Sequence, residues 1–427
     1  MMTPRGGVQE NGMSALHDQH GFRVSGATSR ALELYERALA AYRAWRGDPL
    51  SLVEAALREA PEFVMAHLLR LWLLSGSRDP ASGQRAIRAL EPARALPRNR
   101  REALHLAALE VRLLGDLEAI GERLGALLAE HPRDLLALQV AHGVDYFRGD
   151  ALALRNRALR VLPAWSAAMP GYHAVLAMLG FGLAECGDHA RAAQSARHAL
   201  ALEPADARAW HVLAHAYEHA DRAAEGEREL EAQRARWDGD TMVAAHLDWH
   251  LALYRIAQGR LQDALAVHDA RLAATQAGPL ADRIDAATLL WRLELAGAAP
   301  GERWQALAEA WAPHATDGYC AFNDVHAMLA FVAAGREDCI TALLRTQRRR
   351  AWDSDSNGRM TADVGLPACR ALRCYGRGEY AEAARLLRRL PAVARRLGGS
   401  QAQRHVLALT LEAAEQRAAG LRTPIAA

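Results

Sequence analysis

The sequence predicts an all-α protein in which antiparallel helix hairpins stack into a solenoid. Alanine, leucine, arginine and glutamate dominate the chain, and runs of β-branched residues are nearly absent. Apolar residues recur at helical spacing from Ala31 onward. Turn signals punctuate this pattern roughly every fifteen to twenty residues, and short helices joined by short turns form hairpins. Five of these signals are Gly47-Asp48-Pro49, His131-Pro132, Gly149-Asp150, Gly187-Asp188 and Glu203-Pro204.

The chain divides into two predicted parts. Residues 1–26 are rich in Gly, Ser and polar residues and lack the apolar stretch of a signal peptide, so we expect a flexible leader. Residues 27–427 form a single solenoid, with the most regular repeats at about 173–275. A chain of this length ordinarily holds two or three domains, but repeat proteins grow by stacking.

Composition favours a cytoplasmic protein without nucleic-acid or membrane partners. The 52 basic and 50 acidic residues nearly cancel, so neither kind of charged footprint is present. All basic charge is arginine, which indicates the high-GC codon usage of a bacterium. No apolar run reaches membrane-spanning length. The five cysteines are odd in number and scattered, which favours reduced thiols in the cytosol.

The middle of the chain fits the 34-residue tetratricopeptide period, in which small and large residues recur at helix contacts. If Pro204 closes one repeat, that repeat starts near His173. Advancing by one period places apolar and small residues on the first-helix pattern of the next repeat, namely Trp210, Leu213, Ala214 and Tyr217. A third repeat follows if Ala264 is the small residue of its second helix.

This register predicts which side chains face the concave groove, because the first helix of each hairpin lines that surface. In the best-matched repeat the groove positions are His211, His215, Glu218 and His219. The repeat before contributes Phe181 and Glu185, and the repeat after contributes His246 and Trp249, with His250 one step away. We expect a polar cluster on the groove face.

The leading candidate site is a pair of histidine pairs. His211 and His215 stand four residues apart, as do His246 and His250, so each pair shares one helix face. Imidazoles at this spacing are typical ligands of Zn and other divalent transition metals. The His-x-x-x-His-x-x-Glu pattern ending at Glu218 is not the His-Glu-x-x-His protease signature. Metal binding, acid–base catalysis by His211, His215, Glu218 and His250, and a merely polar groove lining all remain open.

Phe322-Asn323-Asp324-Val325-His326 is a second candidate, at a predicted helix start. In one interpretation Asn323 or Asp324 is an ordinary N-cap. In the other, Asp324 and His326 pair in the groove as catalytic groups, the carboxylate fixing the imidazole tautomer. Phe322 and Asn323 would then contact a substrate.

Further groove residues are candidate substrate contacts. Arg292, two helical turns after Asp285 on a helix predicted over 284–295, would clamp a substrate carboxylate or form a buried pair with Asp285. Phe181 and Glu185 would also contact the substrate, and Trp249 is either an apolar wall or core.

His142 and Asp145 reach the same cavity if the superhelix curls tightly. Seven other histidines are isolated and predicted to be surface or packing residues: His67, His105, His173, His189, His198, His268 and His314. No phosphate loop, dinucleotide fingerprint or Gly-x-Ser-x-Gly elbow appears.

Nine segments of the chain are specific enough to compare with a known family: Arg101-Glu102, His131 to Ala137, Gly180 to Asp188, Ala209 to Glu218, His246 to Tyr254, Leu290 to Leu293, Phe322 to His326, Asp363 to Pro367 and Gly398 to Arg404. On these segments, and from about Ala31 to its C-terminus, the chain resembles the tetratricopeptide repeat protein 38 family. The resemblance implies an eccentric α-solenoid and assigns no reaction. In the last segment and just after it, Gln401 and His405 depart from the residues usual in that family, which are Asn or His and Asp respectively.

Two functional hypotheses follow. The first is a concave pocket that binds a small polar molecule, as an enzyme of the hydrolase or lyase type, with or without a metal. The second is a protein-interaction scaffold, the usual role of such solenoids. Tail-binding grooves present Arg, Lys and Asn, whereas these groove positions are His, Glu, Phe and Trp, which favours the first hypothesis.

Overall fold

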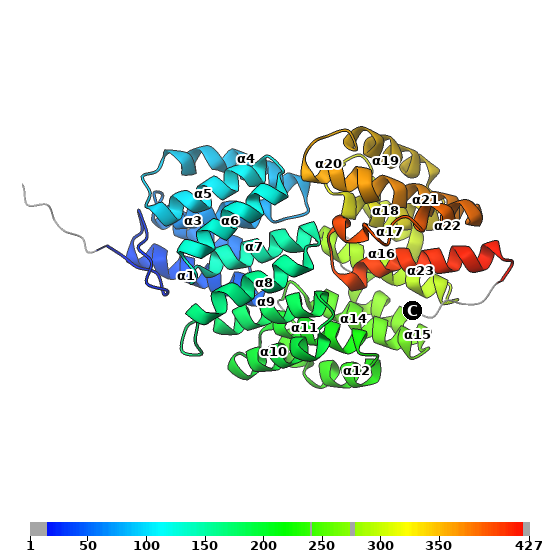
Figure 1. Ribbon diagram of the computed structural model, residues 1–427, viewed down its shortest axis with the longest axis horizontal. Helices are drawn as coiled ribbons and strands as arrows, with labels where there is room; N and C mark the ends of the chain where they lie inside the picture. Colours follow the sequence, from blue (N-terminus) through cyan, green and yellow to red (C-terminus); the bar gives the residue numbers. More distant parts are fainter. Residues whose placement is uncertain (1–14, 240, 274–277, 422–427) are drawn as a thin grey trace, which may run out of the picture.

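The computed structural model describes residues 15–239, 241–273 and 278–421, and within these ranges the only β-structure is two isolated bridges. Helix hairpins follow one another along the whole described chain (Figure 1). The prediction of an all-α, tetratricopeptide-like solenoid is confirmed. No described helix has the length and apolar character needed to cross a membrane.

The first helices of the chain are α1 (Ser29–Ala44), α2 (Pro49–Glu59), α3 (Val64–Ser75), α4 (Pro80–Ala95), α5 (Arg100–Leu113), α6 (Leu117–Glu130), α7 (Leu135–Arg148), α8 (Ala151–Val161) and η1 (Leu162–Ala164). The middle of the chain forms α9 (Tyr172–Glu185), α10 (His189–Leu202), α11 (Ala207–His219), α12 (Ala223–Ala232), α13 (Arg234–Trp237), α14 (Ala244–Ala257), α15 (Leu261–Val267) and η2 (His268–Leu272). The last helices are α16 (Leu280–Leu295), α17 (Arg303–Trp311), η4 (Ala312–His314), α18 (Ala321–Ala333), α19 (Glu337–Arg350), α20 (Ser356–Met360), η5 (Thr361–Gly365), α21 (Leu366–Gly376), α22 (Tyr380–Leu387), η6 (Ala394–Leu397) and α23 (Gln401–Ala418).

The turn signals of the sequence begin helices, because their aspartates act as N-caps. The side chains of Asp48, Asp150 and Asp188 accept backbone N–H groups in the first turns of α2, α8 and α10. Such a carboxylate satisfies donors that have no partner inside the helix. The preceding Gly149 ends α7 with a positive φ of 64°, a conformation that favours glycine.

Each hairpin has a buried first helix and a more exposed second helix. Nearly every residue of α9 and α11 is buried, whereas α10 and α12 bury only narrow faces. Helix α12 carries Gly226 where a Cβ atom would lie 2.8 Å from both Tyr217 and Tyr254. This close approach positions α11 and α14, the helices that carry the two histidine pairs.

Part of the expected leader is packed. Residues 1–14 lie outside the described residues, but Asp18 and Val24 are buried. Asp18 pairs with Arg101 of α5 at 2.9 Å, and the backbone N–H of Ser25 donates to Glu102 at 2.9 Å. The prediction of a flexible leader is therefore wrong for residues 15–26, because buried charges in α5 hold this segment in place.

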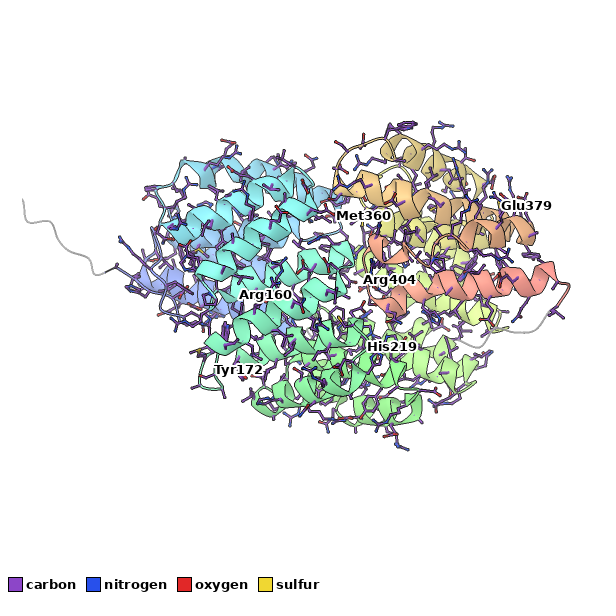
Figure 2. All side chains as sticks on the ribbon, viewed as in Figure 1. Arg160, Tyr172, His219, Met360, Glu379 and Arg404 are labelled. Atoms are coloured by element: carbon purple, nitrogen blue, oxygen red, sulfur yellow. The ribbon has the colours of Figure 1, made fainter. Side chains whose placement is uncertain are left out.

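The two ends of the solenoid meet, so the stack closes on itself. The N–H of Ser356 in α20 donates to the carbonyl of Gly115, and Asn323 Nδ2 donates to the carbonyl of Arg78. Met360 packs against the hydrophobic clusters of both halves. Met360 and Arg404 lie along this junction in Figure 2.

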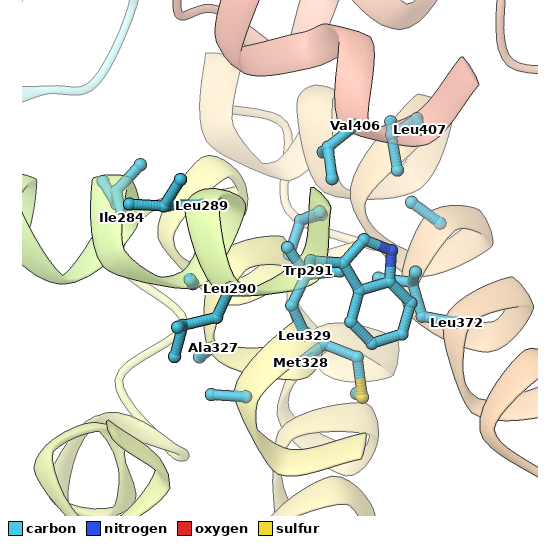
Figure 3. Close-up of a cluster of buried hydrophobic side chains, with 14 of the residues drawn as sticks. Ile284, Leu289, Leu290, Trp291, Ala327, Met328, Leu329, Leu372, Val406 and Leu407 are labelled. Atoms are coloured by element: carbon cyan, nitrogen blue, oxygen red, sulfur yellow. The ribbon is translucent and has the colours of Figure 1, made fainter. Parts of the chain in front are cut away.

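A large hydrophobic cluster joins α16, α18, α21 and α23 (Figure 3). Trp291 lies among Met328, Leu372 and Val406, and its Nε1 donates to Thr410 at 2.9 Å. The last helix is therefore bound to the inner helices, and its first turn enters the concave side.

Candidate functional site: a four-histidine cluster beside a cavity

Helices α11 and α14 bring the two histidine pairs together. Asp206 caps α11 by accepting from the N–H groups of Arg208 and Ala209. Tyr254 of α14 donates its hydroxyl proton to the carbonyl of Ala214 at 2.7 Å, which joins the two helices. The i, i+4 spacing then directs both imidazoles of each helix into the space between them.

We call His211, His215, His246 and His250 the four-histidine cluster. One ring nitrogen of each residue lies within 4.8 Å of the other three. The Nε2 atom of His211 is 2.9 Å from Nε2 of His215 and 3.1 Å from Nε2 of His246. The prediction that these pairs share one side of neighbouring hairpins matches this geometry.

Two carboxylates orient one half of the cluster. His246 Nδ1 donates to Asp285 at 2.7 Å, and His250 Nδ1 donates to Glu218 at 3.0 Å. An ionised carboxylate only accepts hydrogen bonds, so each Nδ1 carries its proton and each Nε2 keeps a lone pair. The Nε2 of His250 has no hydrogen-bond partner, nor does Nδ1 of either His211 or His215.

Burial keeps most of the cluster neutral. The pKa values of His211, His215 and His250 lie well below the usual range, first because burial disfavours the charged ring and then because neighbouring imidazoles repel its charge. Burial also opposes a charge on His246, but the adjacent Asp285 outweighs it and raises that pKa. Neutral imidazole is the form that ligates metals.

The donor set fits a transition metal ion. Around a tetrahedral ion with metal–nitrogen bonds of about 2.0–2.1 Å, ligand nitrogens are about 3.3–3.4 Å apart. Two nitrogen–nitrogen separations in the cluster, 2.9 and 3.1 Å, are slightly below this edge length. The widest separation between ligand nitrogens is at most 4.8 Å, and it would have to shorten around an ion. Metal-bound histidines usually donate their other ring N–H to a carboxylate or carbonyl, and Asp285 and Glu218 accept such bonds from His246 and His250.

A cavity of about 250 Å³ adjoins the cluster. His211 and His246 form part of the cavity wall, whereas His215 and His250 do not line the cavity. Phe181 also lines the cavity and stacks on His211, with ring centroids 5.5 Å apart. Its volume is below the usual range of about 300–1,000 Å³ for ligand pockets, so only a small molecule fits.

The C-terminal segment fills much of the concave side. Gln403 of α23 donates to Asp285 at 3.2 Å and accepts from the Tyr146 hydroxyl at 2.9 Å. Glu185 accepts from the Gln401 N–H at 2.9 Å and pairs with Arg404 at 3.2 Å. Glu185 does not line the cavity and its carboxylate is occupied by α23, so its role as a substrate contact stays a prediction without support from the cavity.

The aromatic predictions divide. Phe322 lines the cavity, as expected of a substrate contact, although its binding role stays a prediction. Trp249 is fully buried and stacks on His246 with centroids 5.1 Å apart, so it supports the His246 ring and does not form the cavity wall. His219, predicted for the groove, stacks instead on His189 at 4.8 Å.

Asp324 and His326 do not form the expected pair. Asp324 accepts from Gln347 Nε2 at 3.3 Å, while His326 Nδ1 donates to the carbonyl of Phe322 at 2.6 Å. The N-cap interpretation is also wrong, since Cys320 is the N-cap of α18 and makes no side-chain cap bond. Asn323 donates to a backbone carbonyl and does not line the cavity. These residues pack α18 against its neighbours.

Asp285 and Arg292 do not form a pair. Asp285 contacts His246 and Gln403, as described above, and Arg292 donates to the carbonyl of Ala402. Arg292 does not line the cavity, so its role as a substrate clamp stays a prediction without support from the cavity. His142 and Asp145 were predicted to reach the same cavity. His142 lines the cavity, whereas Asp145 accepts two hydrogen bonds from Arg157, at 2.6 and 3.0 Å.

Sequence reasoning missed several residues of the cavity wall. Except for Arg208 of α11, they come from segments outside the most regular repeats, and the sequence offered no periodic signal for them apart from the motif at Gly398 to Arg404. They are Tyr42, Trp45, Arg78, Tyr146, Arg208, Asp282 and Gln403.

No protein family model matches the chain, so the resemblance to the tetratricopeptide repeat protein 38 family stays a prediction. The fold is similar to a chain in the crystal structure of the APC/C hetero-tetramer Cut9–Hcn1, with a TM-score of 0.39 and 12% identity, covering 92% of this chain and 78% of that chain. It is also similar to a chain in the structure of Naa15/Naa10 bound to HypK-THB, with a TM-score of 0.32 and 14% identity over 92% and 71% of the two chains. Likenesses this weak carry no argument about function. The helices themselves define the class, an all-α tetratricopeptide-like solenoid closed around a small cavity.

Proposed function

We propose that the protein binds a divalent transition metal ion at the four-histidine cluster and a small polar molecule in the adjoining cavity. The observation that carries this proposal is the convergence of four imidazoles, three buried and that of His246 half-buried, two of them oriented by Asp285 and Glu218. A structural polar core ordinarily satisfies its buried nitrogens. Here the lone pair of His250 Nε2 has no partner.

The bound ion would act as a Lewis acid that polarises a substrate oxygen or activates water, which suits hydrolysis or elimination. Because His211 and His246 belong to the cavity wall, a molecule in the cavity approaches the cluster from their side. Imidazole ligands suit Zn, Cu, Fe and Ni, so the donor set restricts the ion to this group.

Titration of chelator-treated protein with Co²⁺, followed by ligand-field absorption, tests the metal site. We expect one ion per chain and a loss of affinity greater than about 100-fold in His250→Gln, since changes outside the ligand shell alone cost about 10- to 100-fold. The matched control is His189→Gln, which alters a histidine stacked on His219 outside the cluster. Equal binding by wild type and His250→Gln would contradict the proposal.

Protein interaction is the second candidate, and it is the role that solenoids of this class typically have. The observation that favours it is exposed apolar surface near the junction of the two ends, where Leu114 is 78% and Trp352 is 90% exposed. Exposed apolar patches often mark partner sites. A partner that co-purifies at equal stoichiometry and is lost in Trp352→Ser, but retained in His250→Gln, would favour this candidate.

A further inference from the structure

Two arginines in the cavity wall lack a carboxylate partner. Arg208 is 4% exposed and donates no side-chain hydrogen bond to any described residue, and its buried Nε is without a partner. Arg78 makes one weak contact, from Nη1 to the sulfur of Cys320 at 3.5 Å, and its buried Nη2 has none. Neither forms an ion pair with a carboxylate in the described parts of the chain.

Arg208 is buried and Arg78 half-buried in this cavity wall, and they differ in this lack of a partner from Arg101 and Arg157. Arg43 and Arg292, which are buried outside the cavity wall, form no ion pair with a carboxylate either. Arg101 has two aspartate partners and Arg157 has Asp145 in bidentate geometry. A buried charge without a counterion is costly, so its place in a cavity wall calls for an explanation. Burial lowers the pKa of Arg208 to about 10, which still leaves the guanidinium charged at neutral pH. The nearby Asp206 favours this charge through space but makes no direct contact with it, since that carboxylate caps α11 and pairs with His173.

Aromatic rings connect the two guanidinium groups around the cavity. Arg208 Cζ lies 4.0 Å from the centroid of Trp45, and Arg78 Cζ lies 4.3 Å from that of Phe322 and 5.7 Å from that of Tyr146. Stacking fixes the guanidinium planes while leaving their N–H groups free to donate. A ligand between them would meet aromatic faces along its body and positive charge at its polar group.

The cavity wall also contains two acidic residues. Asp282 and Asp285 of α16 line the same cavity. Asp285 is engaged by His246 and Gln403, and the pKa of Asp282 is raised to about 6, first by burial and then by the nearby Asp285. The positive charge on the Arg208 and Arg78 side is therefore not balanced by a direct contact with either aspartate.

We propose that the cavity binds a small organic oxyanion whose carboxylate or phosphate is held by Arg208 and Arg78. Its apolar body lies against Trp45, Phe181 and Tyr146, next to the His211 and His246 face of the four-histidine cluster. The inference rests on the small-molecule cavity of the proposed function but does not require the metal. It names the substrate class of that cavity.

Calorimetric titration with phenylacetate, phenyl phosphate and the neutral 2-phenylethanol tests this inference. The measurements use the full chain, both chelator-treated and after addition of Zn²⁺. We expect at least one anion to bind with a dissociation constant at least tenfold below that of 2-phenylethanol. Tighter binding of phenylacetate identifies a carboxylate site, and tighter binding of phenyl phosphate identifies a phosphate site.

The deciding variants are Arg208→Gln and Arg208→Lys, with Arg191→Gln as the control because Arg191 is exposed and pairs only with Asp188. Arg208→Gln should weaken binding of the anion at least tenfold and leave binding of 2-phenylethanol unchanged. Arg208→Lys should retain part of the affinity for the anion, and Arg191→Gln should bind both ligands as wild type does. The melting temperature of Arg208→Gln should not fall, because no paired charge is lost. Failure of both anions to bind, or equal binding by wild type and Arg208→Gln, would overturn the inference. Arginine-dependent binding to chelator-treated protein would support it even if the metal site failed.

Discussion

The N-terminal hairpins and the middle of the solenoid each bury histidine beside aspartate, but the two clusters differ in how their polar atoms are satisfied. In the first, His105 Nε2 donates to Asp134 at 2.9 Å and its Nδ1 accepts from Trp72 at 3.2 Å. Asp134 also pairs with Arg101 at 2.6 Å and caps α7. Both ring nitrogens of His105 have protein partners.

In the four-histidine cluster, by contrast, not every ring nitrogen has a hydrogen-bond partner. Three of its ring nitrogens are buried without a hydrogen-bond partner, and the cluster adjoins a cavity. Of the ring nitrogens in the cluster, Asp285 accepts only from Nδ1 of His246, and Glu218 accepts only from Nδ1 of His250. The difference teaches that unsatisfied lone pairs beside a cavity, and not buried histidine alone, distinguish a site from a structural network.

Replacing Asp134 should have the largest effect on folding. Asp134→Ala leaves Arg101 buried with one partner fewer and removes the N-cap of α7, so we expect a loss of about 4–6 kcal/mol in the free energy of unfolding. Urea denaturation measures it. The control Asp116→Ala removes only the cap of α6 and should cost about 1 kcal/mol. A loss for Asp134→Ala no larger than that of the control would mean that the first cluster is not a structural network.

Asp324 provides the opposite case, a buried carboxyl with poor partners. Burial raises its pKa to about 7. Because the folded protein then binds the proton more tightly than the unfolded chain, this group favours folding fully below pH 4, and that contribution is lost as the pH rises to about 7. Asp324→Asn should therefore be more stable than wild type by up to about 4 kcal/mol at pH 8, a difference that disappears near pH 4. Urea denaturation of both proteins across this pH range checks it, and a pH-independent difference would contradict the assignment.

Asp285→Asn should alter metal binding more than folding. The amide oxygen can still accept from His246 Nδ1, but the negative charge that supports this ligand is lost. We expect the affinity for Zn²⁺ to fall by about 10- to 100-fold, measured by competition with a chromogenic chelator. The control Asp282→Asn lies in the same cavity wall without a contact to the cluster, and it should change the affinity much less. Equal effects of the two variants would argue against an orienting role for Asp285.

The sequence predicted the fold and the centre of the candidate site well, because both follow from helical periodicity. The spacing of His211 and His215, and of His246 and His250, places each pair on one face, and the repeat period aligns the two faces. The capping aspartates likewise appear as turn signals at Asp48, Asp150 and Asp188.

What could not be predicted depends on contacts between distant segments. The closure of the solenoid brings Ser356 to Gly115. Helix α23 brings Gln401 and Arg404 to Glu185, so this residue, which was predicted to face the groove, contacts another helix of the protein. Trp45 lies on the C-terminal end of α1, outside the regular repeats, yet it reaches the Arg208 side of the cavity. No local pattern records such pairings.

The metal content of the purified protein tests the central claim most directly. We expect near one transition metal ion per chain by elemental analysis in wild type and in His189→Gln, and almost none in the double variant His215→Gln/His250→Gln. A bound ion at 100 times its dissociation constant stabilises the fold by about 2.7 kcal/mol, so a chelator should lower the melting temperature of wild type only. Metal-free wild type whose melting temperature does not change on addition of Zn²⁺, Co²⁺, Ni²⁺, Cu²⁺ or Fe²⁺ would contradict the account.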